Sequence, residues 1–382
     1  MSEIPKSSLY TANTNMIKIT DRAAGCLVGG GCGDALGYAV EFDSYQSICA
    51  EYGDYGIQHY DLTRSADGVE CAIVSDDTQM TLYTAEGLIE AELTGAEILP
   101  TIRQAYLAWY GGQMGRKIKG GYRSALAEIA ELNVQRAPGN TCLTALHSIH
   151  SGRKPANSSK GCGGVMRVAP VGIYGAAHGW DLLRTARLAG DAAELTHLHP
   201  LSTYSSAALA VMIQLSLLSE TVNLSGFKSI VEQSLAVVRD AYGPAAPGFS
   251  TFKTLIREAL NLADTDTSQP DWQVIENEFG GGWVAEETLA IAIYSVARHF
   301  DDFKACMVCA VNHGGDSDST GAVAGNIIGA TMGYDALPDE FTRPLQFRDL
   351  LRRTATLLCE IPASADPAPP HSSYPLLSQI TS

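Results

Sequence analysis

Hydrophobic residues in this chain recur every three or four positions over long stretches, which is the spacing of one face of an α-helix. Residues 206–219 (SAALAVMIQLSLLS) are apolar almost all round, which predicts a buried helix. Sustained period-two alternation, the mark of a half-buried strand, is scarce. Further helices are expected over residues 75–93, 98–110, 123–133, 226–241, 252–263, 283–300, 302–312 and 343–360. The pattern therefore predicts a mainly α-helical protein.

Two segments near opposite ends of the chain are unusually rich in glycine and alanine. They are residues 21–41 (DRAAGCLVGGGCGDALGYAVE) and residues 321–333 (GAVAGNIIGATMG). A glycine inside a helix costs about 1 kcal/mol relative to alanine. Their density indicates close backbone approach, and we expect one helix packed directly on another.

The two ends of the chain differ from the middle in composition. Residues 1–20 are polar and rich in Ser, Thr and Asn, and they are expected to form a flexible N-terminal arm. Thr20 and Asp21 then offer helix caps. Residues 363–382 contain four Pro and many Ser and predict a disordered tail. One domain is expected over residues 21–362.

Composition and charge exclude several classes of protein. The formal net charge of −16 argues against a nucleic-acid backbone or an anionic membrane as partner. No signal peptide and no uninterrupted apolar run of transmembrane length is found. The nine cysteines have irregular spacing, which favours reduced thiols in a cytoplasmic protein. Cys306 and Cys309 form a C-x-x-C pair without zinc-like companions, so we interpret them as packing thiols.

Two clusters of carboxylates and hydroxyls lie far apart in the chain, each before a predicted helix. The first is Ser75, Asp76 and Asp77, and the second is Asp316, Asp318 and Ser319. Burying such carboxylates costs several kcal/mol each unless a cation is present. Oxygen-only ligand sets suit hard cations such as Mg²⁺ or Mn²⁺, and six such residues suit two ions. The alternative is that the clusters are two separate helix caps.

Two acidic residues accompany the first Gly/Ala segment. Asp34 is interpreted as a helix cap or a partner for nearby backbone N–H groups. Glu41 follows an apolar Tyr-Ala-Val run, which makes it a candidate functional residue.

A glycine-rich stretch and a histidine pair complete the candidate chemistry. Gly161, Cys162, Gly163 and Gly164 open a predicted helical segment, where free N–H groups suit phosphate binding; a simple tight turn is the alternative. His197 and His199 are two residues apart with no cysteine nearby. That spacing favours substrate contact or packing over zinc.

Six motifs, taken together and in this order, resemble the ADP-ribosylglycohydrolase family, which includes bacterial dinitrogenase reductase-activating glycohydrolases. Together they span most of residues 20–345, and the pairing of SDDT with GGDSDS is the most specific feature. The motifs are GDALGYAVEF at 33–42, SDDTQM at 75–80, GCGGVMRVAPVG at 161–172, THLHP at 196–200, GGGWVAEETLAIA at 280–292 and NHGGDSDSTGAVAGNIIGA at 312–330.

The resemblance implies a compact, orthogonal all-α bundle with a dinuclear Mg²⁺ or Mn²⁺ centre. By motif, the metal ligands are Ser75, Asp76, Asp77, Asp316, Asp318 and Ser319. Glu41 matches the catalytic glutamate beside the metals. Gly161, Cys162, Gly163 and Gly164 match the segment that cradles the ADP-ribose phosphates, and His197 matches a substrate-contacting histidine. Arginine-directed bacterial members of the family share an Asp in the loop that corresponds to residues 111–121. That loop reads GGQMGRKIKGG in this chain and has no acidic residue.

The resemblance implies an enzyme that removes ADP-ribose from modified protein side chains, with arginine as the family's usual linkage. An alternative is an immunity protein that binds and neutralises an ADP-ribosyltransferase through residues 1–20, in addition to hydrolysis. A third is a hydrolase of free ADP-ribosylated small molecules. Expected partners are therefore an ADP-ribosylated protein and, in the alternative, an ADP-ribosyltransferase.

Overall fold

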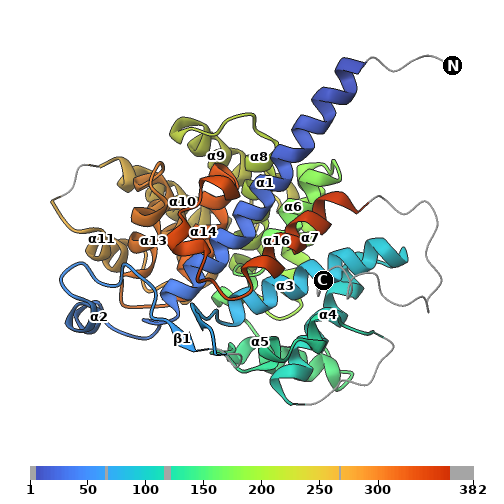
Figure 1. Ribbon diagram of the computed structural model, residues 1–382, viewed down its shortest axis with the longest axis horizontal. Helices are drawn as coiled ribbons and strands as arrows, with labels where there is room; N and C mark the ends of the chain where they lie inside the picture. Colours follow the sequence, from blue (N-terminus) through green and yellow to red (C-terminus); the bar gives the residue numbers. More distant parts are fainter. Residues whose placement is uncertain (1–5, 65–67, 116–121, 266–267, 362–382) are drawn as a thin grey trace.

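The structure, a computed structural model, describes residues 6–64, 68–115, 122–265 and 268–361 and is built almost entirely from helices (Figure 1). The all-α prediction is confirmed. The α-helices are α1 (Lys6–Gly37), α2 (Tyr45–Tyr52), α3 (Asp76–Thr94), α4 (Ile98–Gln113), α5 (Asn140–His150), α6 (Ala169–Ala177), α7 (Leu182–Glu194), α8 (Pro200–Leu218), α9 (Leu224–Tyr242), α10 (Phe249–Asp264), α11 (Asp271–Glu278), α12 (Ala285–Arg298), α13 (Phe303–Val311), α14 (Ser317–Met332), α15 (Asp339–Thr342) and α16 (Arg348–Glu360).

Short elements fill some of the connections. Strands β1 (Thr63–Arg64) and β2 (Glu70–Cys71) form an antiparallel pair. The 3₁₀ helices are η1 (Leu126–Glu128), η2 (Ala130–Asn133), η3 (Cys162–Gly164) and η4 (Tyr334–Ala336). The α-helix expected over residues 123–133 is therefore wrong. In this segment the side-chain amide of Asn133 donates to the carbonyls of Ala127 and Ile129. Such side-chain bonds compete with the backbone hydrogen bonds of an α-helix.

Helices α1 and α14 pack against each other in antiparallel fashion along the middle of the molecule (Figure 1). Four glycines of α1, spaced by one helical turn, face the backbone of α14. A Cβ atom on any of them would lie closer than 3.0 Å to that backbone. The pairs are Gly25 with Gly329, Gly29 with Gly325, Gly33 with Gly321, and Gly37 with Ser317. The two Gly/Ala segments are thus the two sides of one helix contact, as predicted.

This contact decides where the acidic residues lie. Because Gly37 at the end of α1 meets Ser317 at the start of α14, the chain that follows α1 passes the first turn of α14. The amide of Phe42, next to Glu41, reaches the carbonyl of Gly315 at 3.4 Å. The close packing of the two glycine-rich helices therefore places Glu41 near Asp316. No local sequence pattern predicts this proximity.

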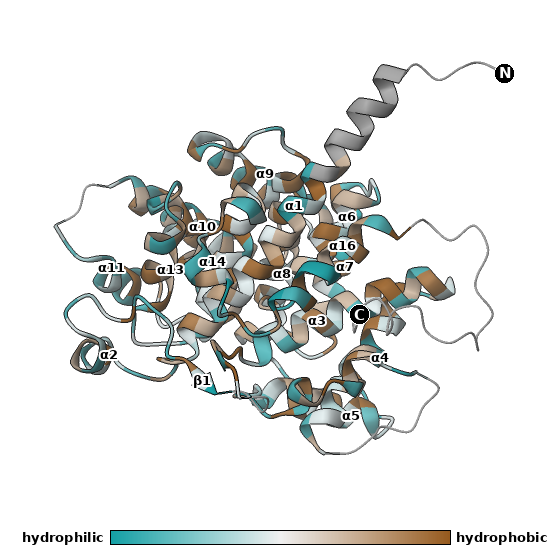
Figure 2. Cartoon of the chain, viewed as in Figure 1, coloured by the Kyte–Doolittle hydropathy of each residue, from teal (hydrophilic) through white to brown (hydrophobic). Residues whose placement is uncertain are grey.

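Helix α8 forms much of the core and contacts α6, α7, α9, α12 and α14. By length and composition it is apolar enough to cross a membrane, with a mean hydropathy of 1.5, but 89% of that stretch is buried within the protein. The outer helices, such as α10, instead carry both hydrophilic and hydrophobic residues (Figure 2). α8 is therefore a buried core helix, as predicted from the apolar residues at 206–219.

The ends of the domain differ in part from expectation. Helix α1 begins at Lys6, well before the cap expected at Thr20 and Asp21, so most of the proposed arm is helical. That the domain itself begins at residue 21 remains a prediction. The tail at 363–382 lies outside the described residues.

All nine cysteines are free thiols, as expected for reduced cysteines. Cys306 and Cys309 are both buried on α13, as expected for packing thiols, and the thiol of Cys309 lies within 4.8 Å of ligand atoms of Asp271 and His299. Burial raises the pKa of both thiols, and Asp302 and Asp271 add to the effect.

Candidate active site

The two predicted acidic clusters lie side by side at the N-terminal ends of α3 and α14. The hydroxyl of Ser319 donates to a carboxylate oxygen of Asp77 at 2.9 Å, across 242 residues of sequence. Both helix ends carry partial positive charge, which stabilises nearby carboxylates. The structure therefore brings together the two halves that the sequence predicts as one centre, and they are not separate exposed caps.

The α14 half is organised around the first turn of that helix. Asp316 is the N-cap, and its Oδ1 accepts from the amide of Ser319 at 3.3 Å. Oδ1 of Asp318 accepts from the same amide at 2.8 Å. The amide of Asp316 is held by the carbonyl of Gly281 at 2.7 Å. These bonds fix the backbone while further carboxylate oxygens stay available to a ligand.

The α3 half is held by a buried carboxylate from α1. Oδ1 of Asp34 accepts from the amide of Ser75 at 2.9 Å, and Oδ2 accepts from the amide of Thr78 at 3.0 Å and from its hydroxyl. This confirms the interpretation of Asp34 as a partner for backbone N–H groups. Ser75 caps α3 through its hydroxyl, which accepts from the amide of Asp77 at 3.2 Å.

Glu41 joins this cluster from the turn after α1. Carboxylate oxygens of Glu41, Asp316 and Asp318 lie within 4.8 Å of one another, a separation that a shared metal ion would bridge. Asp316 and Asp318 are buried, whereas Glu41 is partly exposed. Glu41 therefore connects the buried carboxylates with the solvent side of the site.

The electrostatics show what this arrangement lacks on its own. Burial, and then Asp318, Asp316 and Asp76, raise the pKa of Glu41 to about 10. Burial and Asp318 also raise the pKa of Asp76 and Asp77 well above the usual range, and the pKa of Asp316 shifts in the same direction for the same reasons. So many mutually repelling carboxylates are stable in ionised form only if cations share the space.

The donor set fits hard divalent cations. The side chains that meet at the two helix ends offer oxygen atoms, which Mg²⁺ and Mn²⁺ prefer. The carboxylates are buried close together, and no cationic side chain is found among their contacts in the described residues. Two divalent ions would balance their negative charge.

The glycine-rich segment lies beside this centre and is a 3₁₀ turn, η3. The amide of Cys162 donates to the carbonyl of Trp283 at 3.2 Å, and the amide of Gly161 reaches the hydroxyl of Ser159 at 3.3 Å. The amides of Val165 and Met166 then donate to the carbonyl of Cys162 at 2.9 and 3.1 Å, which closes the turn.

Cys162 has a different environment from the one expected. Its thiol is within hydrogen-bonding reach of Asp316 and Ser319, and burial and the Asp316 charge raise its pKa well above the usual range. Cys162 thus contacts the carboxylate centre, whereas it was expected to contact phosphate only. The SDS and GCGG motifs alone do not reveal that proximity, because it depends on how η3 packs against α7, α8 and α12.

His197 is almost fully buried against the same glycine-rich turn. A Cβ on Gly163 would lie 2.9 Å from Cε1 of His197 and 2.8 Å from Sγ of Cys142. Glycine at this position therefore lets the imidazole edge reach the backbone of the turn. Burial and the neighbouring Arg167 lower the pKa of His197 to about 3, so the ring is neutral. His199 instead caps α8 by accepting from the amide of Leu201.

The acid-free loop at 111–121 is only partly described, since residues 116–121 lie outside the described ranges. Gln113, at its start, is buried, and its Nε2 donates to Oε1 of Gln79 at 3.1 Å. Gln79 also accepts from Nε1 of Trp109 at 3.0 Å. Because Gln79 is in the turn of α3 that carries Asp77, this network ties the loop's start to the carboxylate centre.

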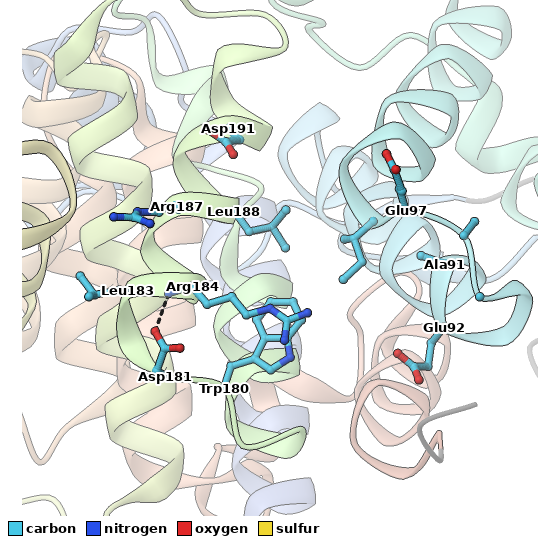
Figure 3. A pocket seen from close by; sticks show the side chains of 13 residues that line it. Ala91, Glu92, Glu97, Trp180, Asp181, Leu183, Arg184, Arg187, Leu188 and Asp191 are labelled. Atoms are coloured by element: carbon cyan, nitrogen blue, oxygen red, sulfur yellow. Dashed lines mark hydrogen bonds between the residues drawn. The ribbon is translucent and has the colours of Figure 1, made fainter. Parts of the chain in front are cut away.

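A separate cavity of about 810 Å³ lies between the α3–α4 connection and α7 (Figure 3). Its walls include Glu92 and Glu97 on one side and Leu188 on the other. The guanidinium of Arg184 stacks over the Trp180 ring at 3.8 Å from the centroid. None of the predicted site residues lines this cavity, so it is not the predicted site.

Fold and site together define an all-helical protein with a buried, oxygen-rich carboxylate centre next to a glycine-rich turn. The model of the ADP-ribosylglycohydrolase family matches residues 15–367, and the chain belongs to that family. It is accordingly a hydrolase that acts on glycosidic bonds of ADP-ribose.

Individual relatives agree with this assignment. The chain is 26% identical to the ADP-ribosyl-[dinitrogen reductase] glycohydrolase of Rhodospirillum rubrum, over 89% of this chain and 96% of that protein. It is 28% identical to the ADP-ribosylhydrolase ARH3 of Homo sapiens, over 48% of this chain and 53% of that protein. A solved structure described as an ADP-ribosylglycohydrolase-related protein complex matches with a TM-score of 0.55 and 25% identity, over 90% of this chain and 99% of that one.

Proposed function

We propose that this chain removes ADP-ribose from modified protein side chains at a dinuclear Mg²⁺ or Mn²⁺ centre, with arginine as the main modified residue. The observation that supports it best is the contact between Ser319 and Asp77, which joins the two carboxylate clusters at 2.9 Å. Glu41 adds a further carboxylate to the same cluster. A buried, purely structural role would not require so many acids in one place.

The residues that would hold the two ions are contributed by both helix ends. When bound, the ions would supply Lewis acidity toward ribose hydroxyls and a more acidic water. The proposed ligands are Ser75, Asp76, Asp77, Asp316, Asp318 and Ser319. Asp34 positions the α3 set by holding the amides of Ser75 and Thr78.

Glu41 is the proposed proton carrier. Its carboxyl group lies at the edge of the centre, where it can exchange protons with a bound molecule and with solvent. Without metal, burial and the neighbouring Asp318 and Asp316 raise its pKa. A carboxyl group in this position can accept a proton from the attacking water or deliver one to the leaving nitrogen as the glycosidic bond breaks.

The glycine-rich turn and His197 are proposed to bind the diphosphate of ADP-ribose. The imidazole of His197 is neutral and lies against this turn, where Nε2 would be 3.3 Å from a Cβ at Gly161 or Gly163. Binding the diphosphate there orients the ribose, so that binding energy remote from the reacting carbon is used for catalysis.

A protein substrate is supported by the relative from Rhodospirillum rubrum, whose name gives ADP-ribosylated dinitrogen reductase as its substrate. Arginine is the expected linkage, although the loop from Gly111 has no acid. The proposal is tested by incubating the chain and Mg²⁺ with arginine-modified and serine-modified protein and measuring free ADP-ribose. Faster release from the arginine substrate supports it. Release from the serine substrate alone contradicts the linkage.

A role as an immunity protein remains a second proposal, for which residues 2–18 are the relevant segment. A deletion of these residues separates the two activities. Lost binding to an ADP-ribosyltransferase with retained hydrolysis supports a dual role, and unchanged binding excludes this segment as the contact.

A further inference from the structure

Arg167 is fully buried, and the contacts found for it among the described residues are with neutral groups. Its Nη2 donates to the carbonyl of Ala192 at 3.2 Å, and its guanidinium lies 4.3 Å from the centroid of the Tyr106 ring. Its Nε has no hydrogen-bond partner within the part of the chain that the structure describes. A charge buried in this way is costly, so its position calls for an explanation beyond packing.

Arg167 is linked to His197 through one hydroxyl group. Nη2 of Arg167 donates to Oγ1 of Thr196 at 2.6 Å, and Oγ1 lies 2.8 Å from Nδ1 of His197. A guanidinium only donates, so Oγ1 is the acceptor in the first bond. The hydroxyl hydrogen is then directed to Nδ1, because the other acceptor, the carbonyl of Ala193, is farther away at 3.4 Å.

This order of donors determines the tautomer of His197. If Nδ1 accepts, the neutral ring carries its hydrogen on Nε2. Nε2 lies on the side of the ring that faces the glycine-rich turn, since a Cβ on Gly161 or on Gly163 would be 3.3 Å from it. No hydrogen bond of Nε2 is found within the described residues. The ring therefore presents a fixed N–H donor where the diphosphate is proposed to bind.

We propose that Arg167 and Thr196 are positioning residues that hold His197 in its Nε2–H tautomer, as an obligatory donor to a phosphate oxygen of ADP-ribose. The inference rests on the proposed function, because it takes the glycine-rich turn as the diphosphate site. The guanidinium of Arg167, which has no carboxylate partner among its described contacts, adds long-range attraction for the same anion. Without the hydroxyl of Thr196, His197 would be free to place its hydrogen on Nδ1 and present a lone pair to the phosphate.

The tautomer itself is measured by ¹⁵N NMR of the full chain labelled at histidine, with His197→Gln used to assign the signal. Wild type and Thr196→Ser are expected to show the Nε2–H form alone at pH 7. Thr196→Val, which is similar in shape, is expected to show a mixture of tautomers. A wild-type ring protonated on Nδ1, or an unchanged tautomer in Thr196→Val, overturns the proposal.

The consequence for binding is measured by calorimetry with ADP-ribose as the probe. Thr196→Val should weaken ADP-ribose binding about tenfold, as for one hydrogen bond to a charged group, with Thr196→Ser within about twofold of wild type. In turnover, Thr196→Val should raise KM and leave kcat nearly unchanged. Unchanged ADP-ribose affinity in Thr196→Val contradicts the inference.

His197→Gln separates positioning from a general loss of structure. The glutamine amide keeps a donor in place of Nε2–H and has no tautomer to fix. It should bind ADP-ribose within about threefold of wild type, and adding Thr196→Val to it should weaken binding no further. A tenfold loss in both backgrounds shows a structural effect and overturns the proposal. If these results hold but no ADP-ribose is released from modified protein, the proposed function fails and the positioning role stands.

Discussion

The hydroxyl of Ser319 on α14 donates to Oδ1 of Asp77 on α3 at 2.9 Å, and this bond spans the junction between the two acidic clusters. Ser319 can fulfil this role because Asp316 and Asp318 both hold its amide, which fixes its side chain at the start of α14. One hydroxyl thus aligns two carboxylate sets that the chain places far apart.

Replacing Ser319 should therefore weaken metal binding. Ser319→Ala loses the bond to Asp77 and a proposed ligand oxygen, and we expect the affinity for Mg²⁺ to fall by about tenfold or more. The affinity is measured from the rise in thermal midpoint with increasing Mg²⁺. Ser319→Thr keeps the hydroxyl and should remain within a few-fold of wild type. Equal affinities in all three proteins would show that Ser319 does not contribute to metal binding.

Asp316→Asn should raise stability without metal and reduce the stabilisation that Mg²⁺ provides. With a chelator present at pH 8, the variant should be more stable than wild type, because one member of a repelling carboxylate cluster is removed. Addition of Mg²⁺ should stabilise wild type more than the variant, because ligand binding to the folded state raises stability. Thermal unfolding with and without Mg²⁺ measures both effects. A variant that is less stable in chelator would contradict the electrostatic account.

Glu86 should make stability depend on pH in a region away from the centre. It is buried on α3 and accepts from the hydroxyls of Ser124 and Tyr122 and the amide of Leu126. Burial raises its pKa from 4.5 to about 7. The folded state thus binds this proton more tightly than the unfolded chain, so its contribution to stability is full below pH 4.5 and is lost as pH rises through 7.

Glu86→Gln should remove that dependence. Between about pH 4.5 and 8, wild type should lose roughly 3 kcal/mol of unfolding free energy relative to the variant. Urea unfolding in saturating Mg²⁺ at several pH values measures this difference. Glu97→Gln, at an exposed position, serves as the control and should follow wild type. A difference between wild type and Glu86→Gln that does not change with pH would contradict the assignment.

The glycine contact between α1 and α14 should tolerate no side chain. A Cβ on Gly33 would overlap the backbone of Gly321, so Gly33→Ala forces the helices apart and should destabilise the fold by roughly 1–3 kcal/mol. The change should also lower metal affinity, because the separation moves Glu41 from Asp316. Urea unfolding measures the first effect and Mg²⁺ titration the second.

Gly226→Ala is the matched control. Gly226 lies in α9, where an added Cβ meets only Oδ1 of Asn223 at 3.4 Å. Alanine favours helix there, so this variant should be as stable as wild type or more stable by about 0.5–1 kcal/mol. If Gly33→Ala behaved in the same way, close helix packing would not be what brings the site together.

Much of this architecture follows from the sequence because its signals are local. The density of Gly and Ala in both segments predicts a direct helix contact. Asp76 and Asp316 lie at the starts of helices that the sequence predicts. The presence of all-helical structure is equally local, since it depends on periodicity within each segment.

Other features depend on long-range packing and carry no local signal. The thiol of Cys162 reaches Asp316 because η3 is held against α7, α8 and α12. The bond between Thr196 and His197 matters because Arg167 is buried beside it. The early start of α1 at Lys6 was also missed, because polar residues with ordinary helix propensity resemble a disordered segment when nothing shows what they pack against.

The most direct test of the central claim is the rate of ADP-ribose release from arginine-modified protein by wild type and Asp316→Asn, with Mg²⁺ or with chelator. Asp301→Asn, at an exposed position, is the control. We expect release by wild type and by Asp301→Asn in Mg²⁺, its loss in chelator, and a fall of at least roughly 100-fold in Asp316→Asn. Wild-type rates in correctly folded Asp316→Asn, or undiminished release in chelator, would contradict a metal-dependent carboxylate centre.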